Sequence, residues 1–89
     1  MNRFPLVFIV VLNYNGRATL PECLRSIFRL DYPLFQVVVL DNASTDGSFE
    51  QARRTYPKAH FISNSENVGF ARGMNVGIRF ALDQRAEYI

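Results

Sequence analysis

Apolar residues cluster in short blocks along the chain, and each block is followed by a polar segment. Residues 6–12 are seven consecutive apolar side chains, rich in β-branched types and too few for a helix. This pattern is typical of a strand buried on both faces. Residues 35–40 resemble that block, and residues 60–62 form a shorter one. The sequence therefore predicts three strands, and residues 87–89 look like the opening of a fourth.

Between the blocks, apolar residues recur every three or four positions, which is the spacing of one helix face. We expect helices over residues 20–30, 48–56 and 69–82, joined to the strands by short connections. Such an alternation predicts an α/β fold, a Rossmann-like three-layer sandwich with a mostly parallel sheet. At 89 residues, the chain has room for a single domain over 1–89.

Three residues carry local expectations. Thr19 and Glu22 stand three positions apart and predict a capping box at the start of the first helix. Cys23 has no cationic neighbour in the sequence, so we expect a small core residue rather than a reactive thiol. His60 has no second ligand at a metal spacing, and we expect a structural histidine.

Composition excludes several classes of function. A net charge of +2, with no basic cluster larger than Arg53–Arg54, argues against a nucleic-acid partner. One cysteine excludes an internal disulfide and a cysteine-rich zinc site. The longest apolar run, residues 5–12, is about half of the ~20 residues that a membrane span requires, and no signal peptide is apparent. We therefore expect a cytoplasmic chain with no transmembrane segment of its own.

Polar residues gather where the predicted strands end. The three segments 13–15, 41–46 and 63–67 are rich in Asn, Asp and Ser. Because the carboxyl ends of parallel strands meet at one edge of a sheet, these segments should lie close together. Ligands bind in the crevice at that edge, so the sequence predicts a site there.

Asp41 is the candidate that stands immediately after a buried strand. A carboxylate in that position can accept hydrogen bonds from ribose hydroxyls or from the imide N–H of a pyrimidine. It can equally accept from backbone N–H groups of its own turn. Ser44 and Asp46 are better explained as helix caps than as ligands. The glycine-rich motifs of dinucleotide-binding domains and of P-loop ATPases are both missing from the sequence.

Gly69, Gly73 and Gly77 recur every four residues in the third predicted helix. Glycine inside a helix costs about 1 kcal/mol relative to alanine, so this stripe requires a physical reason. We expect close packing at Gly73 and Gly77, where alanine would destabilise the protein. Gly69 lies at the helix start with Asn67, where N–H groups can face an anion. Alanine there should leave melting nearly unchanged but weaken ligand binding.

Three motifs in register carry a resemblance that covers essentially the whole chain. Residues 10–16 (VVLNYNG), 40–47 (LDNASTDG), and 67–70 (NVGF) with 75–77 (NVG) resemble the N-terminal half of family 2 glycosyltransferases. The last motif is similar to the rhamnosyltransferase branch and related enzymes of cell-surface polysaccharide biosynthesis. One departure is that many members carry Ala-Arg-Asn where this chain has residues 73–75, Gly-Met-Asn. Met74 stands at the position of that arginine and carries no charge, so no role of the arginine is expected in this chain.

The resemblance implies a GT-A fold, truncated here to its donor-nucleotide-binding half. It places the segment from Leu12 to Tyr14 against a pyrimidine, with Tyr14 stacking on the base, and it places Asp41 on the base imide or ribose. Gly69 and Asn75 would lie along the nucleotide groove. The nucleotide-sugar-binding residues expected on this basis are Leu12, Asn13, Tyr14, Asp41, Asn42, Asn67, Gly69 and Asn75.

In the family, an inverting enzyme transfers a sugar from a nucleotide-diphosphate sugar to a saccharide or lipid-linked acceptor, usually with Mg²⁺ or Mn²⁺. The family's metal-binding Asp-x-Asp follows a segment like residues 87–89, and its catalytic base comes later. We therefore expect no catalytic and no metal-binding residue in this chain. The chain is interpreted as an N-terminal fragment that is inactive by itself. Its expected location is the cytoplasm, and peripheral association with the inner face of the cell membrane stays open.

Two alternatives remain beside this interpretation. The chain could be a free-standing, non-catalytic nucleotide-binding or interaction module, in which case its coding sequence would stop at Ile89. A nucleotidyltransferase-like domain would require a glycine-rich basic loop after the first strand, and residues 13–17 match that requirement poorly. The donor base, the donor sugar, the acceptor and the oligomeric state are not specified by these residues.

Overall fold

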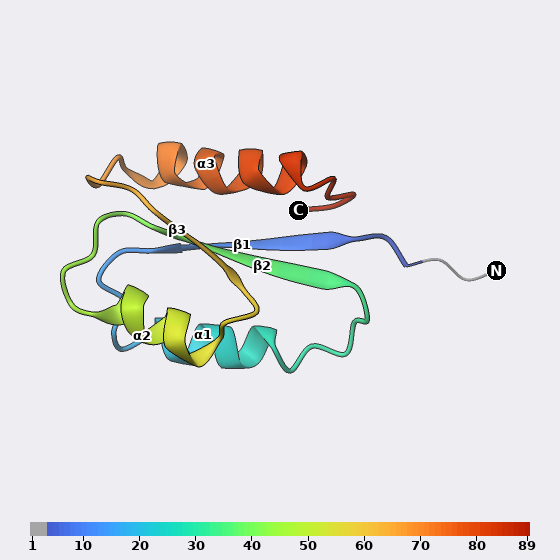
Figure 1. Ribbon diagram of the computed structural model, residues 1–89, viewed down its shortest axis with the longest axis horizontal. Helices are drawn as coiled ribbons and strands as arrows, with labels where there is room; N and C mark the ends of the chain where they lie inside the picture. Colours follow the sequence, from blue (N-terminus) through green and yellow to red (C-terminus); the bar gives the residue numbers. More distant parts are fainter. Residues whose placement is uncertain (1–3) are drawn as a thin grey trace.

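The computed structural model describes residues 4–89, which form a parallel sheet with helices on both faces (Figure 1). Helices α1 and α2 lie on one face of the sheet and α3 lies on the other. The expected three-layer α/β sandwich is therefore confirmed. In chain order the elements are β1 (Val7–Asn13), α1 (Leu20–Ile27), β2 (Phe35–Asp41), α2 (Ser48–Thr55), β3 (His60–Ser63) and α3 (Phe70–Asp83).

The strand order is β1-β2-β3, with β2 in the centre. Val37–Asp41 of β2 are all buried, as the uninterrupted apolar pattern predicts. In β1, by contrast, Phe8 and Asn13 are buried and the residues around them are half-buried. The expectation that residues 6–12 are buried on both faces is therefore wrong for most of β1, because β1 lies at an edge of the described sheet.

The segment 87–89 lies on the free side of β1. Val7 and Tyr88 form an isolated parallel bridge. The Phe8 N–H donates to the Tyr88 carbonyl at 2.8 Å, and the Tyr88 N–H donates to the Leu6 carbonyl at 3.1 Å. This arrangement confirms that the segment opens a fourth strand, placed so that β1 stands between it and β2.

Side chains of β2 point alternately to the two faces and so belong to two apolar clusters. Val37 and Val39 pack against α1 and α2, whereas Val38 packs on the face of α3. Burial of each such side chain contributes about 1.5–3 kcal/mol. The buried members of the two clusters are Leu20, Leu24, Val37, Val39 and Ala52 on one face, and Phe8, Val38 and Ala81 on the other.

The start of α1 differs from expectation. Thr19 is the N-cap residue, but its side chain makes no capping hydrogen bond, so the expected capping box is wrong. The backbone supplies the turn instead, because the Thr19 and Leu20 N–H groups donate to the Gly16 carbonyl at 3.0 and 2.7 Å. Cys23 is exposed rather than in the core, because the inward stripe of α1 passes through Leu20 and Leu24.

Candidate functional site

The carboxyl ends of the three strands meet at one edge of the sheet, on the left of Figure 1. Asn13 pairs with Asp41, and Asp41 pairs with Ser63, so the last residues of the strands lie in one row. The loops 14–19, 42–47 and 64–69 all leave from this row. The predicted gathering of polar segments at one edge is confirmed.

The carboxylate of Asp41 accepts three hydrogen bonds, and only 2% of the residue's surface is exposed. Its Oδ1 accepts from Asn13 Nδ2 at 2.8 Å and from Ser44 Oγ at 2.7 Å, and its Oδ2 accepts from the Ser44 N–H at 2.8 Å. A carboxylate has about four lone-pair sites, so one site on Oδ2 stays available. Asp41 is thus an acceptor for its own turn, and one lone pair of its Oδ2 has no donor among the contacts described.

Asn13, one of the predicted nucleotide ligands, lies inside the protein with 3% of its surface exposed. Besides Asp41, its Nδ2 contacts Ser48 Oγ at 2.9 Å and Ser44 Oγ at 3.3 Å. The amide nitrogen carries two hydrogens, and the two shorter contacts, to Asp41 and Ser48, use both. The Asn13 amide nitrogen therefore joins the ends of β1 and β2 to the start of α2.

Asp46 bonds to the first residue of α2 and to the loop that follows β1. Its Oδ1 accepts from Ser48 Oγ at 2.5 Å and from the Ser48 N–H at 3.0 Å, and its Oδ2 accepts from the Arg17 N–H at 3.0 Å. The Ser48 hydroxyl above all, helped by the Ser48 and Arg17 N–H groups, lowers the pKa of the Asp46 carboxyl, while desolvation opposes the shift. The N-cap residue of α2 is Gly47, so Asp46 is not the cap itself, although it does accept from the N–H of Ser48. Ser44 belongs to the Asp41 network instead.

Asn42 fixes the start of α3. It is 2% exposed, its Nδ2 donates to the Gly69 carbonyl at 3.0 Å, and its Oδ1 accepts from Asn64 Nδ2 at 2.9 Å. Asn67 Oδ1 accepts from the Gly69 N–H at 2.8 Å. The Gly69 N–H therefore does not face an anion as the sequence suggested, because the side chain of Asn67 already binds it.

The glycine stripe has two different causes. A Cβ at Gly73 would lie 2.8 Å from Leu12 Cδ1, and one at Gly77 would lie 2.5 Å from Val10 Cγ1, so close packing is confirmed at both. The side chain of Leu12 thus lies under α3. At Gly69 a Cβ would meet nothing within 4 Å, but φ is +86°, a conformation that favours glycine. The reason given for an unchanged melting of Gly69→Ala is therefore wrong, because alanine would be strained there.

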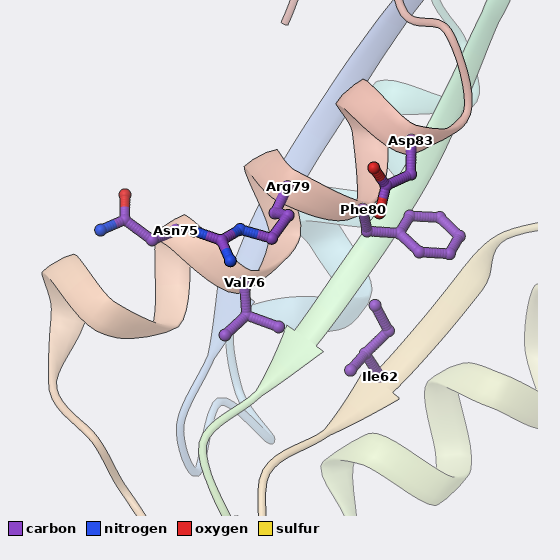
Figure 2. A pocket seen from close by; sticks show the side chains of 6 residues that line it. All are labelled: Ile62, Asn75, Val76, Arg79, Phe80 and Asp83. Carbon is purple, nitrogen blue, oxygen red and sulfur yellow. The ribbon is translucent and has the colours of Figure 1, made fainter.

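Tyr14 and Asn75, two of the predicted nucleotide-sugar-binding residues, are both exposed. Tyr14 is 55% exposed in the loop that follows β1, with its ring available for stacking. Asn75 borders a hollow of about 480 Å³ between α3 and β3. Figure 2 shows Ile62, Val76 and Phe80 forming its apolar side, while the Asn75 amide points away from them.

The resembled family usually uses a divalent metal, which requires several carboxylate or imidazole ligands close together. Among residues 4–89, no three His, Cys, Asp or Glu side chains come together as a metal site would require. The carboxylates of Asp41 and Asp46 are instead engaged by hydrogen-bond donors. The described residues therefore do not fit a metal ion, and no chemical step is assigned to one here.

The fold and its polar edge define a Rossmann-like α/β domain with a ligand site at the carboxyl ends of its strands. The sequence model of "Glycosyl transferase family 2" matches residues 8–89. The chain therefore belongs to glycosyl transferase family 2.

Relatives and a solved structure agree with this assignment. An uncharacterized glycosyltransferase of Haemophilus influenzae is 30% identical over 81 residues, which cover 88% of this chain and 25% of that protein. TuaG of Bacillus subtilis, named as a teichuronic acid biosynthesis glycosyltransferase, is 26% identical over 86% of this chain and 32% of its own length. The chain thus spans about a quarter to a third of the length of these curated relatives.

The structural match is to the mannosyltransferase PcManGT from Pyrobaculum calidifontis, solved in complex with GDP-Man and Mn²⁺. The TM-score is 0.80 at 35% identity, and the match covers 89% of this chain and 25% of that one. The expected GT-A fold is confirmed by this match. The rhamnosyltransferase branch stays a prediction. In the part of the chain that the structure describes, no helix is both long and apolar enough to span a bilayer.

Proposed function

We propose that residues 1–89 form the donor-nucleotide-binding half of an inverting glycosyltransferase. The complete enzyme transfers a sugar from a nucleotide-diphosphate sugar to a saccharide or lipid-linked acceptor of the cell surface. The observation that carries this proposal is that the exposed Tyr14 ring and the Asp41 carboxylate stand at the carboxyl ends of the neighbouring strands β1 and β2, in a chain of this family. The GDP-Man complex of PcManGT supports a nucleotide sugar as ligand.

In this proposal, Tyr14 stacks on the base and Asp41 Oδ2 accepts from its imide N–H or from a ribose hydroxyl. The buried amides of Asn13 and Asn42 act by holding the strand ends and the start of α3 in place. Mg²⁺ or Mn²⁺ is expected in the complete enzyme, held by ligands from outside this chain. The other predicted groove contacts are Asn67, Gly69 and Asn75, and Leu12 through its backbone, since its side chain lies under α3.

Calorimetry with UDP and with GDP tests the proposal on the chain itself. Tyr14→Ala is the informative variant, because Asp41 also holds the fold together. We expect it to weaken binding by about 1–3 kcal/mol, the contribution of one aromatic side chain stacked on a base. The matched control is Tyr88→Ala, which removes a tyrosine that is 63% exposed at the opposite end of β1. Absence of binding by the parent chain, or equal effects of the two variants, would overturn the proposal.

We also propose that the chain alone transfers no sugar. Incubation with GDP-mannose or UDP-glucose and Mn²⁺ should release no nucleoside diphosphate above a blank without protein. Detectable turnover would contradict this. The alternative of a non-catalytic module gives the same result, so the coding sequence after Ile89 must discriminate. A reading frame that continues into Asp-x-Asp supports the enzyme, and a stop codon supports the module.

A further inference from the structure

The loops that follow β1 and β2 are joined by three hydrogen bonds that the roles proposed above do not use. The Asn15 N–H donates to Ser44 Oγ at 2.8 Å, and the Thr45 N–H donates to Asn15 Oδ1 at 2.8 Å. The Arg17 N–H donates to Asp46 Oδ2 at 3.0 Å. We call these three bonds the inter-loop clasp. They join segments that lie 29 or 30 residues apart in the sequence.

Ser44 connects this clasp to the Asp41 carboxylate. Its hydroxyl hydrogen goes to Asp41 Oδ1 at 2.7 Å, while its oxygen accepts the Asn15 N–H. A hydroxyl has one hydrogen and two lone pairs, so one group can serve both neighbours at once. Tyr14 directly precedes Asn15. The Ser44 hydroxyl therefore fixes the position of the loop that carries Tyr14 relative to the Asp41 carboxylate.

The backbone on both sides of this contact has an unusual conformation. Asn15 has φ of 50° and Ala43 has φ of 61°, both in the left-handed region. A residue other than glycine is uncommon there and is held by its surroundings. Asn15 is held through its N–H and its side-chain oxygen, both of which bond to the loop 42–47. Both hydrogen bonds that tie Asn15 to the loop 42–47 thus belong to the clasp.

We propose that Ser44 is a positioning residue for the donor nucleotide. It fixes the stacking ring of Tyr14 at a set place relative to the acceptor site of Asp41, without touching the ligand. This inference rests on the proposed function, because the two groups must bind one nucleotide together. Ordering a loop before the ligand arrives reduces the entropy lost on binding, so loss of the hydroxyl should weaken affinity.

Two measurements on the same variants test the inference. Hydrogen exchange followed by NMR reports the Asn15 and Val38 amides, and calorimetry reports the affinity for UDP and GDP. Ser44→Ala should speed exchange at Asn15 while Val38, in the centre of the sheet, keeps its protection. Its affinity for the nucleotide that the parent binds should fall about threefold to tenfold, because the loop that carries Tyr14 must then be ordered on binding. Ser44→Thr, which keeps the hydroxyl, should restore both.

A second pair of variants keeps the test independent of substitutions at Ser44. Asn15→Ala removes the acceptor for the Thr45 N–H and should weaken binding, whereas Asn15→Asp keeps an oxygen there and should not. Ser26→Ala, on an exposed position of α1, is the control for a serine removed away from the site. All titrations are made well below the melting temperature, so that a change in stability alone leaves the affinity unchanged.

Each outcome decides a separate question. If Ser44→Ala leaves Asn15 exchange unchanged, the clasp itself is refuted. If Asn15 loses protection but affinity stays at the parent value, the positioning role is refuted while the proposed function stands. If the parent chain binds neither nucleotide, the proposed function fails, and the positioning role fails with it. The exchange data still report in that case whether the clasp exists.

Discussion

Asp41 shows how much one side chain at a strand end depends on its neighbours. Three donors converge on its carboxylate from Asn13 and Ser44, and the residue is almost completely buried. Because both oxygens accept, neither can be exchanged for a donor without loss. The contact with Asn13 also holds the ends of β1 and β2 together.

Asp41→Asn is therefore expected to destabilise the chain although the two side chains have the same shape. The amide nitrogen would face either the two donors at Oδ1 or the one at Oδ2, leaving a buried N–H without an acceptor. Such an unsatisfied group costs about 1–3 kcal/mol. Urea denaturation of the variant measures this loss. Asp31→Asn, at an exposed loop position, is the control, and equal stabilities of the two variants would contradict the prediction.

The lowered pKa of Asp46 predicts that the stability of the chain decreases at acidic pH. The folded-state pKa of Asp46 is lowered, chiefly by the Ser48 hydroxyl, below the ordinary value of 3.8. The carboxylate therefore contributes stability that is fully present above the ordinary pKa and is lost as the pH falls through the lowered one. Between about pH 6 and about pH 3, the parent should lose more stability than Asp46→Asn. Parallel losses in thermal melts of the two proteins would refute this.

The sequence identifies Asp41 as a candidate but not the state of its side chain. Its place after an apolar block indicates the strand end and hence the sheet edge. Its partner Asn13 lies 28 residues away, and Asn13 also bonds Ser48, 35 residues away. Contacts at such separations depend on how the loops fold back on one another. For that reason Ser48 and Asn15 were missed, and Asn13 and Asn42 were expected to face a ligand.

Among the elements, α3 depends most on a tight contact with its neighbour. Gly77→Ala should destabilise the chain, because the added methyl would lie 2.5 Å from Val10 Cγ1 and valine has little rotamer freedom. Overpacking costs about 1–3 kcal/mol. The gain in helix propensity is at most about 1 kcal/mol, so the loss should exceed it.

A double-mutant cycle measures whether this contact is the cause. In the background Val10→Ala, the methyl groups of Val10 are gone, and Gly77→Ala should then cost less or even stabilise the helix. Thermal melts of the four proteins provide the coupling energy. If Gly77→Ala has the same effect in both backgrounds, close packing against Val10 does not explain this glycine.

The type and order of all six elements follow from the apolar pattern, because strand and helix periods differ clearly in this chain. The first and last residues of the elements are predicted less well by this pattern. The first helix was expected to reach residue 30, but it ends at Ile27, before the apolar pattern does. The burial of β1 could not be predicted from its composition, since it depends on what lies beside the strand rather than on the strand itself.

For the whole molecule, the free side of β1 matters most. Beyond the bridge between Val7 and Tyr88, the described residues leave this side of the strand unpaired. The Val7 N–H points to Leu34 on the side of β2, whereas the Phe8 N–H points the other way, to Tyr88. Because N–H directions alternate along a strand, those of Val10 and Leu12 face the free side.

Hydrogen exchange should therefore alternate along β1. The amides of Ile9 and Val11 should be protected by β2, while those of Val10 and Leu12 should exchange rapidly in dilute protein. Protection of Val10 and Leu12 that rises with protein concentration would reveal a second copy paired at this edge. Uniform protection at every concentration would contradict the described sheet order.

The bridge between Val7 and Tyr88 also sets a length scale for the fourth strand. A strand prolonged in this register would run beside β1 and reach the level of Asn13 six positions after Tyr88, because Asn13 is six positions after Val7. At about 3.3 Å per residue, that is a run of roughly 20 Å. Residues that follow this point would be separated from Asp41 by β1, because β1 lies between the fourth strand and β2. One backbone pairing at the amino end of the sheet thus sets the register of any residues that a fourth strand would bring beside β1 at the carboxyl end.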